Sequence, residues 1–590
     1  MASSPRDPPL FDRSFFDASE TFTRIGTGAL GGKATGLVRI KEVLDAAFAA
    51  QAAGPVRVDI PALTVLTTAV FDAFIRANRL ADIALSDEPD DRIAHAFQRA
   101  ELPVEVVGDL RALVREVHTP LAVRSSSLLE DAIFRPFAGV YGTKMIPNNQ
   151  PDTDTRFRML AEAVKFVWAS TYFREAKDYI RATDQRIEDE KMAVVMQEVV
   201  GQRHGDRFYP DVSGVARSYD FYPLGAGQPS DGVVSLALGL GKTIVDGEMC
   251  WTFSPARPRA APPFASAREL LHRTQTSFWA VRMGRAPEHD PIRETEYLVR
   301  ASLEDADLDG TLRHLASTYD AGSDRLSIGV GASGPRALNF APILVLEEVP
   351  LCSVVRSLLQ VCEAALHGPV EIEFAMTLGR GPEPSARLGF LQIRPMVVTE
   401  ESVEITDAEM ASAHALLASE AIMGNGVERG IRDVVYVKPG TFEARHTRTI
   451  AAEVAGINHR LLAEGRPYLL IGFGRWGSAD PWLGIPVVWG QISGARTIVE
   501  ATLPEMNVDA SQGSHFFHNI SSFRVGYFAV HHDGPYRIDW ERLDAQPAAH
   551  ETGFVRHVRL PSDLVVKLDG HRRRGVVLAA EGAAAEGGQA

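Results

Sequence analysis

The spacing of hydrophobic positions changes along this chain, and the changes outline a protein of mixed helices and strands. Apolar residues from Leu37 to Phe48 recur at helical spacing, whereas Ala62-Leu-Thr-Val-Leu66 is typical of the start of a β-branched strand. This alternation over roughly the first 120 residues predicts an α/β arrangement. From Lys191 onward the pattern is different, because strand-like runs follow one another with loops between them, at 192–200, 214–218 and 233–238. These runs predict an antiparallel or mixed sheet.

The pattern also divides the chain into regions. The Pro/Ala-rich stretch 254–267 predicts a surface excursion, because repeated prolines cannot donate hydrogen bonds to a sheet. After a linker at 397–405, Ile450, Val454, Ile457 and Leu461 recur at helical spacing, and a strand at 468–472 follows a Gly465-Arg-Pro break. We therefore expect the following regions: a flexible N-terminus (1–19), two subdomains (20–190 and 191–400), a separate C-terminal α/β domain (405–575) and a disordered tail (576–590).

Composition and charge exclude some classes of protein. The net charge of −15 over 590 residues argues against a nucleic-acid partner, because affinity for phosphate backbones comes mostly from Lys and Arg. The three cysteines, at positions 250, 352 and 362, have no metal-like or paired spacing, which fits a reducing compartment. The N-terminus lacks a signal-like apolar core, and no apolar run approaches the roughly 18 residues that span a bilayer. We expect a cytoplasmic protein without a membrane partner, and the sequence does not indicate its oligomeric state.

One segment concentrates the residues that bind polyphosphates. In Leu121-Ala-Val-Arg-Ser-Ser-Ser-Leu-Leu-Glu-Asp131 an apolar strand ends in Arg124, three serines and an acidic pair, and Phe137-Ala-Gly-Val-Tyr-Gly-Thr143 follows. A guanidinium can bond two phosphate oxygens at once, and serines and glycine let backbone N–H groups approach an anion. The alternative is a capped helix start, with Ser126 or Ser127 as the N-cap.

A second cation lies beside the predicted start of a helix. Gly31-Gly-Lys33 precedes the apolar helix that begins near Leu37, and helix N-termini bind anions. The spacing is not that of a Walker A loop, which requires Gly-x4-Gly-Lys-Ser/Thr. Lys33 is therefore a candidate phosphate ligand, and a solvated surface lysine is the alternative.

Two predicted strands carry a candidate metal site. Glu371 and Glu373 are two residues apart and therefore project from one strand face, and Gln392 and Arg394 share a face of the next strand. Paired carboxylates repel each other unless a cation lies between them, and Mg²⁺ prefers oxygen ligands shared with substrate phosphates. The amide of Gln392 could complete the metal shell while Arg394 neutralises a transferring phosphoryl group. A sheet face held by Glu–Arg salt bridges is the alternative.

These motifs together resemble a known family. Val123-Arg-Ser-Ser-Ser-Leu-Leu-Glu-Asp131 with Phe137-Ala-Gly139 is similar to the ATP-binding segment of phosphoenolpyruvate synthase and pyruvate phosphate dikinase. Three further matches occur in the family's order, over roughly residues 20 to 400. They are Gly31-Gly-Lys-Ala-Thr-Gly36, Gly239-Leu-Gly-Lys-Thr-Ile-Val-Asp-Gly-Glu248, and Glu371-Ile-Glu-Phe-Ala375 with Leu391-Gln-Ile-Arg-Pro395.

The resemblance implies an ATP-grasp-like nucleotide-binding region with ATP and Mg²⁺ as cofactors. It implies that Lys33 and Arg124 hold the ATP phosphates, and that the strand Met192 to Gly201 packs the adenine, with Gln197 and Glu198 as polar candidates. It also implies a cofactor-binding role for Gly239 and Gly241 of the central glycine motif.

The sequence departs from the family at several points. Glu371 stands where the family usually has Asp, and Lys242 stands where it usually has Glu. The Thr-x-Gly-Gly-x-x-Ser/Thr-His pattern of the phosphohistidine domain does not occur, and the roughly 190 residues after Pro395 are too few for the pyruvate-binding barrel. Synthesis of phosphoenolpyruvate by this chain alone is therefore not expected.

The C-terminal region has its own candidate residues. Gly472-Phe-Gly-Arg-Trp-Gly477 matches G-x-G-x-x-G, but the residues that follow cannot form the helix of a dinucleotide fold, so we interpret it as a loop presenting Arg475 and Trp476. In Ser511-Gln-Gly-Ser-His-Phe-Phe-His518, His515 could accept a phosphoryl group, act as a base, form half of a metal pair with His518, or be structural.

The sequence thus predicts an α/β (α+β) protein with an ATP-grasp-like region and a C-terminal α/β domain. The leading functional hypothesis is an ATP-dependent phosphotransferase of dikinase or kinase type, acting on a small-molecule or protein acceptor that the sequence does not specify. Its candidate catalytic residues are Lys33, Arg124, Arg394 and His515. The competing hypothesis is an ATP-binding regulatory protein with reduced catalysis, motivated by Lys242 and the missing phosphohistidine domain.

Overall fold

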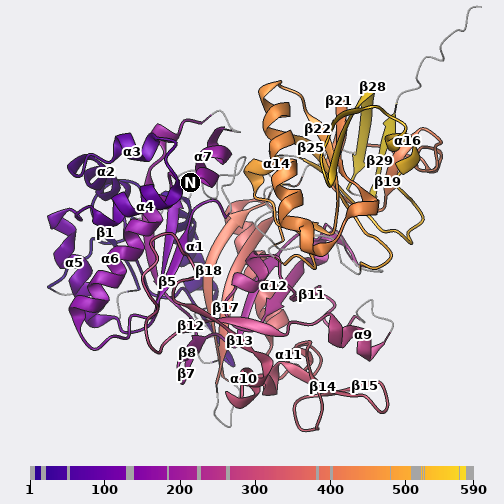
Figure 1. Cartoon of the computed structure of the whole chain (residues 1–590). Coiled ribbons are helices and arrows are strands. Elements are labelled where there is room, and N and C mark those ends of the chain that lie inside the picture. The colour runs from indigo at the N-terminus through magenta and orange to yellow at the C-terminus, as the bar shows by residue number, and fades with distance from the viewer. Residues whose placement is uncertain are drawn as a thin grey trace, which may run out of the picture. The chain divides into compact units, whose positions relative to one another are not determined.

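The computed structural model has two compact units, which we describe separately (Figure 1). The first comprises Met1–Val245 and Met249–Met396, and the second comprises Asp246–Glu248 and Val397–Ala590. The structure describes residues 7–14, 21–48, 54–127, 139–181, 185–221, 223, 227–260, 266–379, 385–396, 398, 403–478, 480–506, 520, 523, 525–570 and 572–579. The structure confirms the predicted fold class, a mixture of helices with parallel and antiparallel strands.

A five-stranded sheet forms the N-terminal part of the first unit. Its order is β1 (Phe22–Ile25), β3 (Leu63–Leu66), β6 (Met192–Glu198), β4 (Leu121–Ser127) and β5 (Thr143–Ile146). The helices of this part are α2 (Thr68–Ala77), α3 (Ala81–Leu85), α4 (Asp90–Arg99), α5 (Val104–Glu116), α6 (Thr153–Ser170) and α7 (Arg174–Arg181). Strand β6 was expected beside the strands that follow it along the chain, but it pairs with β3 and β4 instead.

A six-stranded sheet forms the centre of the first unit. Its order is β11 (Trp251–Phe253), β10 (Val233–Ala237), β9 (Val212–Arg217), β17 (Val370–Leu378), β18 (Ala386–Pro395) and β2 (Val56–Asp59). Its helices α1 (Gly31–Phe48) and α12 (Leu351–Leu366) lie against one face (Figure 1). Helix α1 buries Ala34, Leu37, Ile40, Leu44 and Phe48 there, which is the helical stripe that the sequence predicts. The opposite face therefore carries the polar side chains of these strands.

Two smaller sheets complete the first unit. One contains β13 (Leu298–Ser302), β12 (Ser277–Arg282), β8 (Arg207–Tyr209) and β7 (Gln202–His204), and the other contains β15 (Arg325–Ile328), β14 (Ala316–Asp320) and β16 (Arg336–Leu338). Short helices lie between the strands of these sheets and of the six-stranded sheet: α8 (Lys242–Val245), α9 (Ala267–His272), α10 (Leu303–Leu308) and α11 (Ala341–Leu344).

The second unit is built on one large mixed sheet. Its main path is β19 (Ala415–Ser419), β29 (Arg574–Ala579), β28 (Val555–Asp569), β21 (Asn425–Val437), β22 (Tyr468–Phe473), β25 (Ala495–Ala501), β26 (Gly526–Val530) and β20 (Ala421–Met423), with β27 (Ala548–Glu551) beside β28. Strands β21, β22, β25 and β26 are parallel, and α14 (Thr447–Ala463) connects the first two. Helix α14 buries Ile450, Val454, Ile457 and Leu461, as the sequence predicts.

The remaining elements of the second unit are short. In the part of the chain that the structure describes, they include α13 (Asp407–Met410), α16 (Trp540–Asp544), β23 (Arg475–Trp476) and β24 (Gly484–Ile485). Among the described residues of both units, no helix combines the length and the apolar character needed to cross a bilayer.

Candidate functional site

The start of helix α1 is clamped to the end of strand β4. The Ala34 N–H donates to Ser126 Oγ (3.2 Å), and that hydroxyl donates to the Leu30 carbonyl (2.9 Å). Gly31 has φ +77°, and a Cβ at this position would lie 1.7 Å from the Ser126 carbonyl oxygen. Only glycine fits this approach, so the Gly31-Gly-Lys33 motif brings the helix N-terminus directly onto the serines of β4.

This clamp places Lys33 inside the protein. Its Nζ donates to the backbone carbonyl and the hydroxyl of Ser125, at 3.1 and 3.2 Å, and the side chain is buried. A solvated surface lysine, the alternative left open by the sequence, is thereby excluded. Ser125 directly follows Arg124 in β4, and successive side chains of a strand point to opposite faces, so the hydroxyl that binds Lys33 and the Arg124 side chain project from opposite faces of this strand.

A β-bulge determines which side chains of β18 face the site. Glu373 pairs with Gln392, but the next residue, Phe374, pairs with Phe390, so Leu391 has no partner on β17. Without this extra residue, strict alternation would place Gln392 and Arg394 on the face of Phe390, which lies in the core. The bulge turns these two polar residues to the opposite face, where Glu371 and Glu373 project.

Arg124 connects the two larger sheets of the first unit. Its Nη2 donates to Gln392 Oε1 (2.6 Å) and lies 3.2 Å from Glu373 Oε2, and its Nη1 donates to the Leu391 carbonyl (3.2 Å). A longer contact of 3.5 Å reaches Gln197 Oε1. The residue that the bulge leaves without a register partner on β17 therefore uses its carbonyl to hold this guanidinium.

Two further arginines surround the carboxylates. Arg394 lies 3.6 Å from Glu371 and 3.3 Å from Glu373, and Arg217 Nε donates to Glu371 Oε2 at 2.7 Å. The predicted site residues Arg124, Arg394, Glu371, Glu373 and Gln392 therefore come together, and Arg217 joins them. Lys33 contacts Ser125 of β4. Sequence reasoning missed Arg217, although an arginine in the otherwise apolar run Gly214-Val-Ala-Arg-Ser218 was a visible signal.

The polar residues of the predicted adenine strand have different surroundings. Gln197 is buried and faces Arg124, whereas Glu198 alternates to the other side of β6. Burial raises the pKa of the Glu198 carboxyl, and the charge of Arg387 opposes the rise. Gln197 is thus a neighbour of the phosphate-binding candidates, while contact of either residue with adenine stays a prediction.

The central glycine motif is attached to the polar face of the six-stranded sheet. Ser213 Oγ donates to the Gly239 carbonyl (2.6 Å), and a Cβ at Gly241 would lie 3.7 Å from the Ser213 Cβ. Gly239 has φ +80°, and a Cβ there would lie 2.6 Å from the Trp279 carbonyl oxygen. Both glycines therefore lie close to other backbone or side-chain atoms, and Lys242 begins helix α8 directly after them.

Some predicted features lie elsewhere. His515 and His518 fall outside the described residues, as do Glu130, Asp131 and Phe137. The interpretation of Trp476 as a presented ring is wrong, because its indole is buried and donates to the Val499 carbonyl (3.1 Å).

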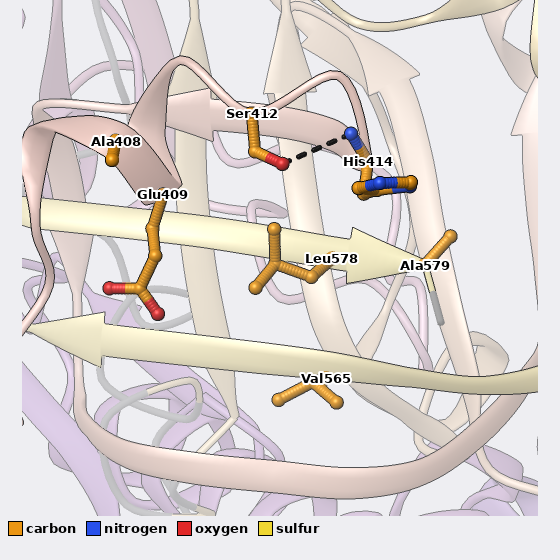
Figure 2. A pocket seen from close by; sticks show the side chains of 7 residues that line it. All are labelled: Ala408, Glu409, Ser412, His414, Val565, Leu578 and Ala579. Carbon is orange, nitrogen blue, oxygen red and sulfur yellow. Dashed lines mark hydrogen bonds between the residues drawn. The ribbon is translucent and has the colours of Figure 1, made fainter. Parts of the chain in front are cut away.

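A cavity of about 380 Å³ lies in the second unit, beside β28, β29 and α13 (Figure 2). Its lining is mostly apolar, and its acidic member, Glu409, already pairs with Lys567. Ser412 Oγ accepts a hydrogen bond from the His414 backbone N–H at 3.1 Å. The lining residues are Ala408, Glu409, Ser412, His414, Val565, Leu578 and Ala579. None of the predicted phosphate or metal ligands lines this cavity, so it is not the candidate site.

Comparison with known families identifies the region that carries the site. The family model described as "Pyruvate phosphate dikinase, AMP/ATP-binding domain" matches residues 27–414, more than half of the 590-residue chain. The chain belongs to this family. The resemblance predicted from the four motifs is confirmed, and the AMP/ATP-binding domain contains the whole cluster from Lys33 to Arg394. A search of curated proteins finds no match.

Proposed function

We propose that this chain is an ATP-dependent phosphotransferase and that the cluster in its AMP/ATP-binding domain holds the nucleotide phosphates. One observation carries the proposal: Arg124, Arg217 and Arg394 are gathered around the carboxylates of Glu371 and Glu373 on one sheet face. Three cations around two anions leave an excess of positive charge, which suits a polyphosphate. Phosphoryl transfer requires mainly positioning and charge stabilisation, and buried cations supply both.

The donor set of the cluster also fits Mg²⁺. Glu373 and Gln392 offer a carboxylate and an amide oxygen on one face, with the Glu371 carboxylate two residues away on the same face. Oxygens of these types are ligands that Mg²⁺ accepts alongside substrate phosphates. Bound Mg²⁺ would supply neutralising charge to the phosphates. The residues of the chain have their own roles: Lys33 and Arg124 bind and orient the nucleotide phosphates, and Arg394 stabilises the charge of the transferring group.

The test uses Arg394→Ala and Glu373→Ala, with Arg387→Ala as a matched control. Arg387 lies on the same strand as Arg394 and also pairs with a carboxylate, Asp59 at 3.0 Å, but its side chain is partly exposed and lies outside the cluster. We expect each site variant to lower ATP turnover by about 10²-fold or more, because each removes a charge aimed at the reacting group. The control should retain turnover, and circular dichroism should show all three variants folded. Unchanged turnover in both site variants would contradict the proposal.

The products of the same assay distinguish the finer alternatives. We propose AMP and phosphate as products, as for a dikinase, because the family match covers the whole ATP region. ATP labelled at the β position should then label the protein, and loss of this label in His515→Ala would identify His515 as the carrier. ADP without labelled protein would indicate direct transfer to a small-molecule or protein acceptor, with the C-terminal domain as its binding region. Tight ATP binding without ADP or AMP would favour the regulatory alternative, which Lys242 motivates.

A further inference from the structure

The two carboxylates of the site are not equivalent. On three adjacent strands, Arg217, Glu371 and Arg394 occupy paired positions, so the Glu371 carboxylate lies between two guanidinium groups. Two residues along, the corresponding positions are Val215, Glu373 and Gln392. Strand β9 therefore supplies an arginine to Glu371 but an apolar side chain to Glu373.

Burial and partners strengthen this difference. The Glu371 side chain is 5% exposed and accepts a hydrogen bond from Arg217 at 2.7 Å, whereas the Glu373 side chain is 15% exposed and lies 3.2 and 3.3 Å from Arg124 and Arg394. The partners of Glu373 are Arg124 and Arg394, which are the two guanidinium groups proposed to bind phosphate. A nucleotide that attracts these arginines would uncover Glu373, while Glu371 would keep Arg217.

We propose that Arg217 is a positioning residue that withdraws Glu371 from metal binding and fixes it as an anchor for Arg394. The divalent cation is then held through Glu373 and Gln392. Without Arg217, the buried Glu371 carboxylate would keep Arg394 at 3.6 Å but lose its hydrogen-bonded partner, so its freed oxygen would be available to a divalent cation. This inference rests on the proposed nucleotide site but not on turnover.

The test measures binding of Mn²⁺, a spectroscopic substitute for Mg²⁺, to the full chain by electron paramagnetic resonance without nucleotide. Arg217→Met should tighten Mn²⁺ binding at least about tenfold. The Arg217 charge repels a cation bound nearby, and at an effective dielectric constant near 20 the loss of this repulsion corresponds to more than a tenfold change in affinity. Arg217→Lys retains the charge and should bind Mn²⁺ like the wild type. The double variant Arg217→Met/Glu371→Gln should also return to the wild-type affinity, which would identify Glu371 as the released ligand.

A second comparison does not depend on the folding of Arg217→Met. In the wild-type background with a non-hydrolysable ATP analogue, Glu373→Gln should weaken Mn²⁺ binding at least tenfold, whereas the isosteric Glu371→Gln should change it less than threefold. Equal weakening by both glutamine variants would overturn the inference, as would unchanged Mn²⁺ affinity in folded Arg217→Met. If these binding results hold but the chain consumes no ATP, the proposed phosphotransferase activity fails and the role of Arg217 stands.

Discussion

A buried ion pair, Lys144–Glu296, provides a quantitative test of what stabilises the first unit. Both side chains are 1% exposed, and their charged atoms are 2.5 Å apart. Lys144 Nζ donates to the Asp290 carbonyl at 3.0 Å and lies 4.9 Å from the centre of the Phe166 ring. The pair joins β5 of the five-stranded sheet to the segment that precedes β13 of another sheet.

The expected magnitude follows from this burial. Lys144→Met removes the lysine from a buried carboxylate that then has His289 Nδ1 at 3.1 Å, and loss of one partner of a buried ion pair costs about 3–5 kcal/mol of the free energy of unfolding. An exposed pair at the same separation should contribute less than about 1 kcal/mol, because water already solvates both charges. Lys41 and Asp45 form such a control: they are 2.6 Å apart, with side chains 33% and 61% exposed. Lys144→Met/Glu296→Leu should recover most of the lost stability, because it removes both charges.

A chain of two compact units need not unfold in one step, so the assay must report on the region of the ion pair itself. Hydrogen exchange of peptides that cover β5, measured in increasing urea, gives this local stability. Lys41→Met serves as the control variant. The reasoning is refuted if Lys144→Met costs no more than Lys41→Met. It is also refuted if the double variant is as unstable as the sum of its two single variants, because the charges would then not be coupled.

Two further predictions concern buried titratable groups. Burial, with smaller contributions from Glu294, Asp90 and Asp178, raises the pKa of Glu175 from 4.5 to about 7. Burial disfavours ionised Glu175 in the folded protein, so the protein loses stability as the pH rises from 4.5 to about 7. Glu175→Gln should therefore stabilise the protein by at most about 3 kcal/mol at pH 8 and should not stabilise it below pH 4.5. Equal gains at both pH values in thermal melts would contradict this prediction. Burial also raises the pKa of Cys352 to about 11 and that of Cys362 to about 12. At pH 8 both thiols should react with iodoacetamide at least about 100-fold more slowly than a free cysteine. Mass spectrometry should show that Cys250 is labelled first. Rapid labelling of Cys362 in the folded protein would contradict the prediction.

The helices show how far the sequence predicts local structure. The apolar stripe from Leu37 to Phe48 correctly indicates a helix, but α1 begins six residues earlier, at Gly31. The extra turn contains Gly31-Gly-Lys33, and its hydroxyl partner is Ser126, which is 92 residues distant from Ala34 in the sequence. Helix starts are normally recognised by a neighbouring Ser, Thr, Asp or Asn. When a distant strand supplies the hydroxyl, the residues next to the helix carry no such signal. The spacing of apolar residues therefore predicts the helix but not the residue at which it begins.

The site residues show a similar limit. Strand alternation is enough to place Glu371 and Glu373 on one face, because their separation of two residues matches the period of a strand. It could not reveal the bulge at Leu391, because the sequence of β18 does not show which residue lacks a partner on β17. Nor could it reveal Arg217, which is 154 residues from its partner Glu371. Contacts between strands far apart in the chain depend on register, and register is set by the assembled sheet.

The paired state of the cluster implies that nucleotide and cation binding are coupled. Arg124 now bonds Gln392 and Glu373, which are the proposed cation ligands. A phosphate that binds Arg124 leaves the Gln392 and Glu373 oxygens with fewer hydrogen-bond donors. A cation that binds these oxygens leaves Arg124 without two of its acceptors. Each ligand therefore lowers the cost of binding the other, and by linkage the effect is the same in both directions. The sequence left two interpretations of this surface, a sheet face held by Glu–Arg salt bridges and a nucleotide site. On this argument they are two states of the same surface, because the ion pairs hold the arginines in place until phosphate replaces the carboxylates.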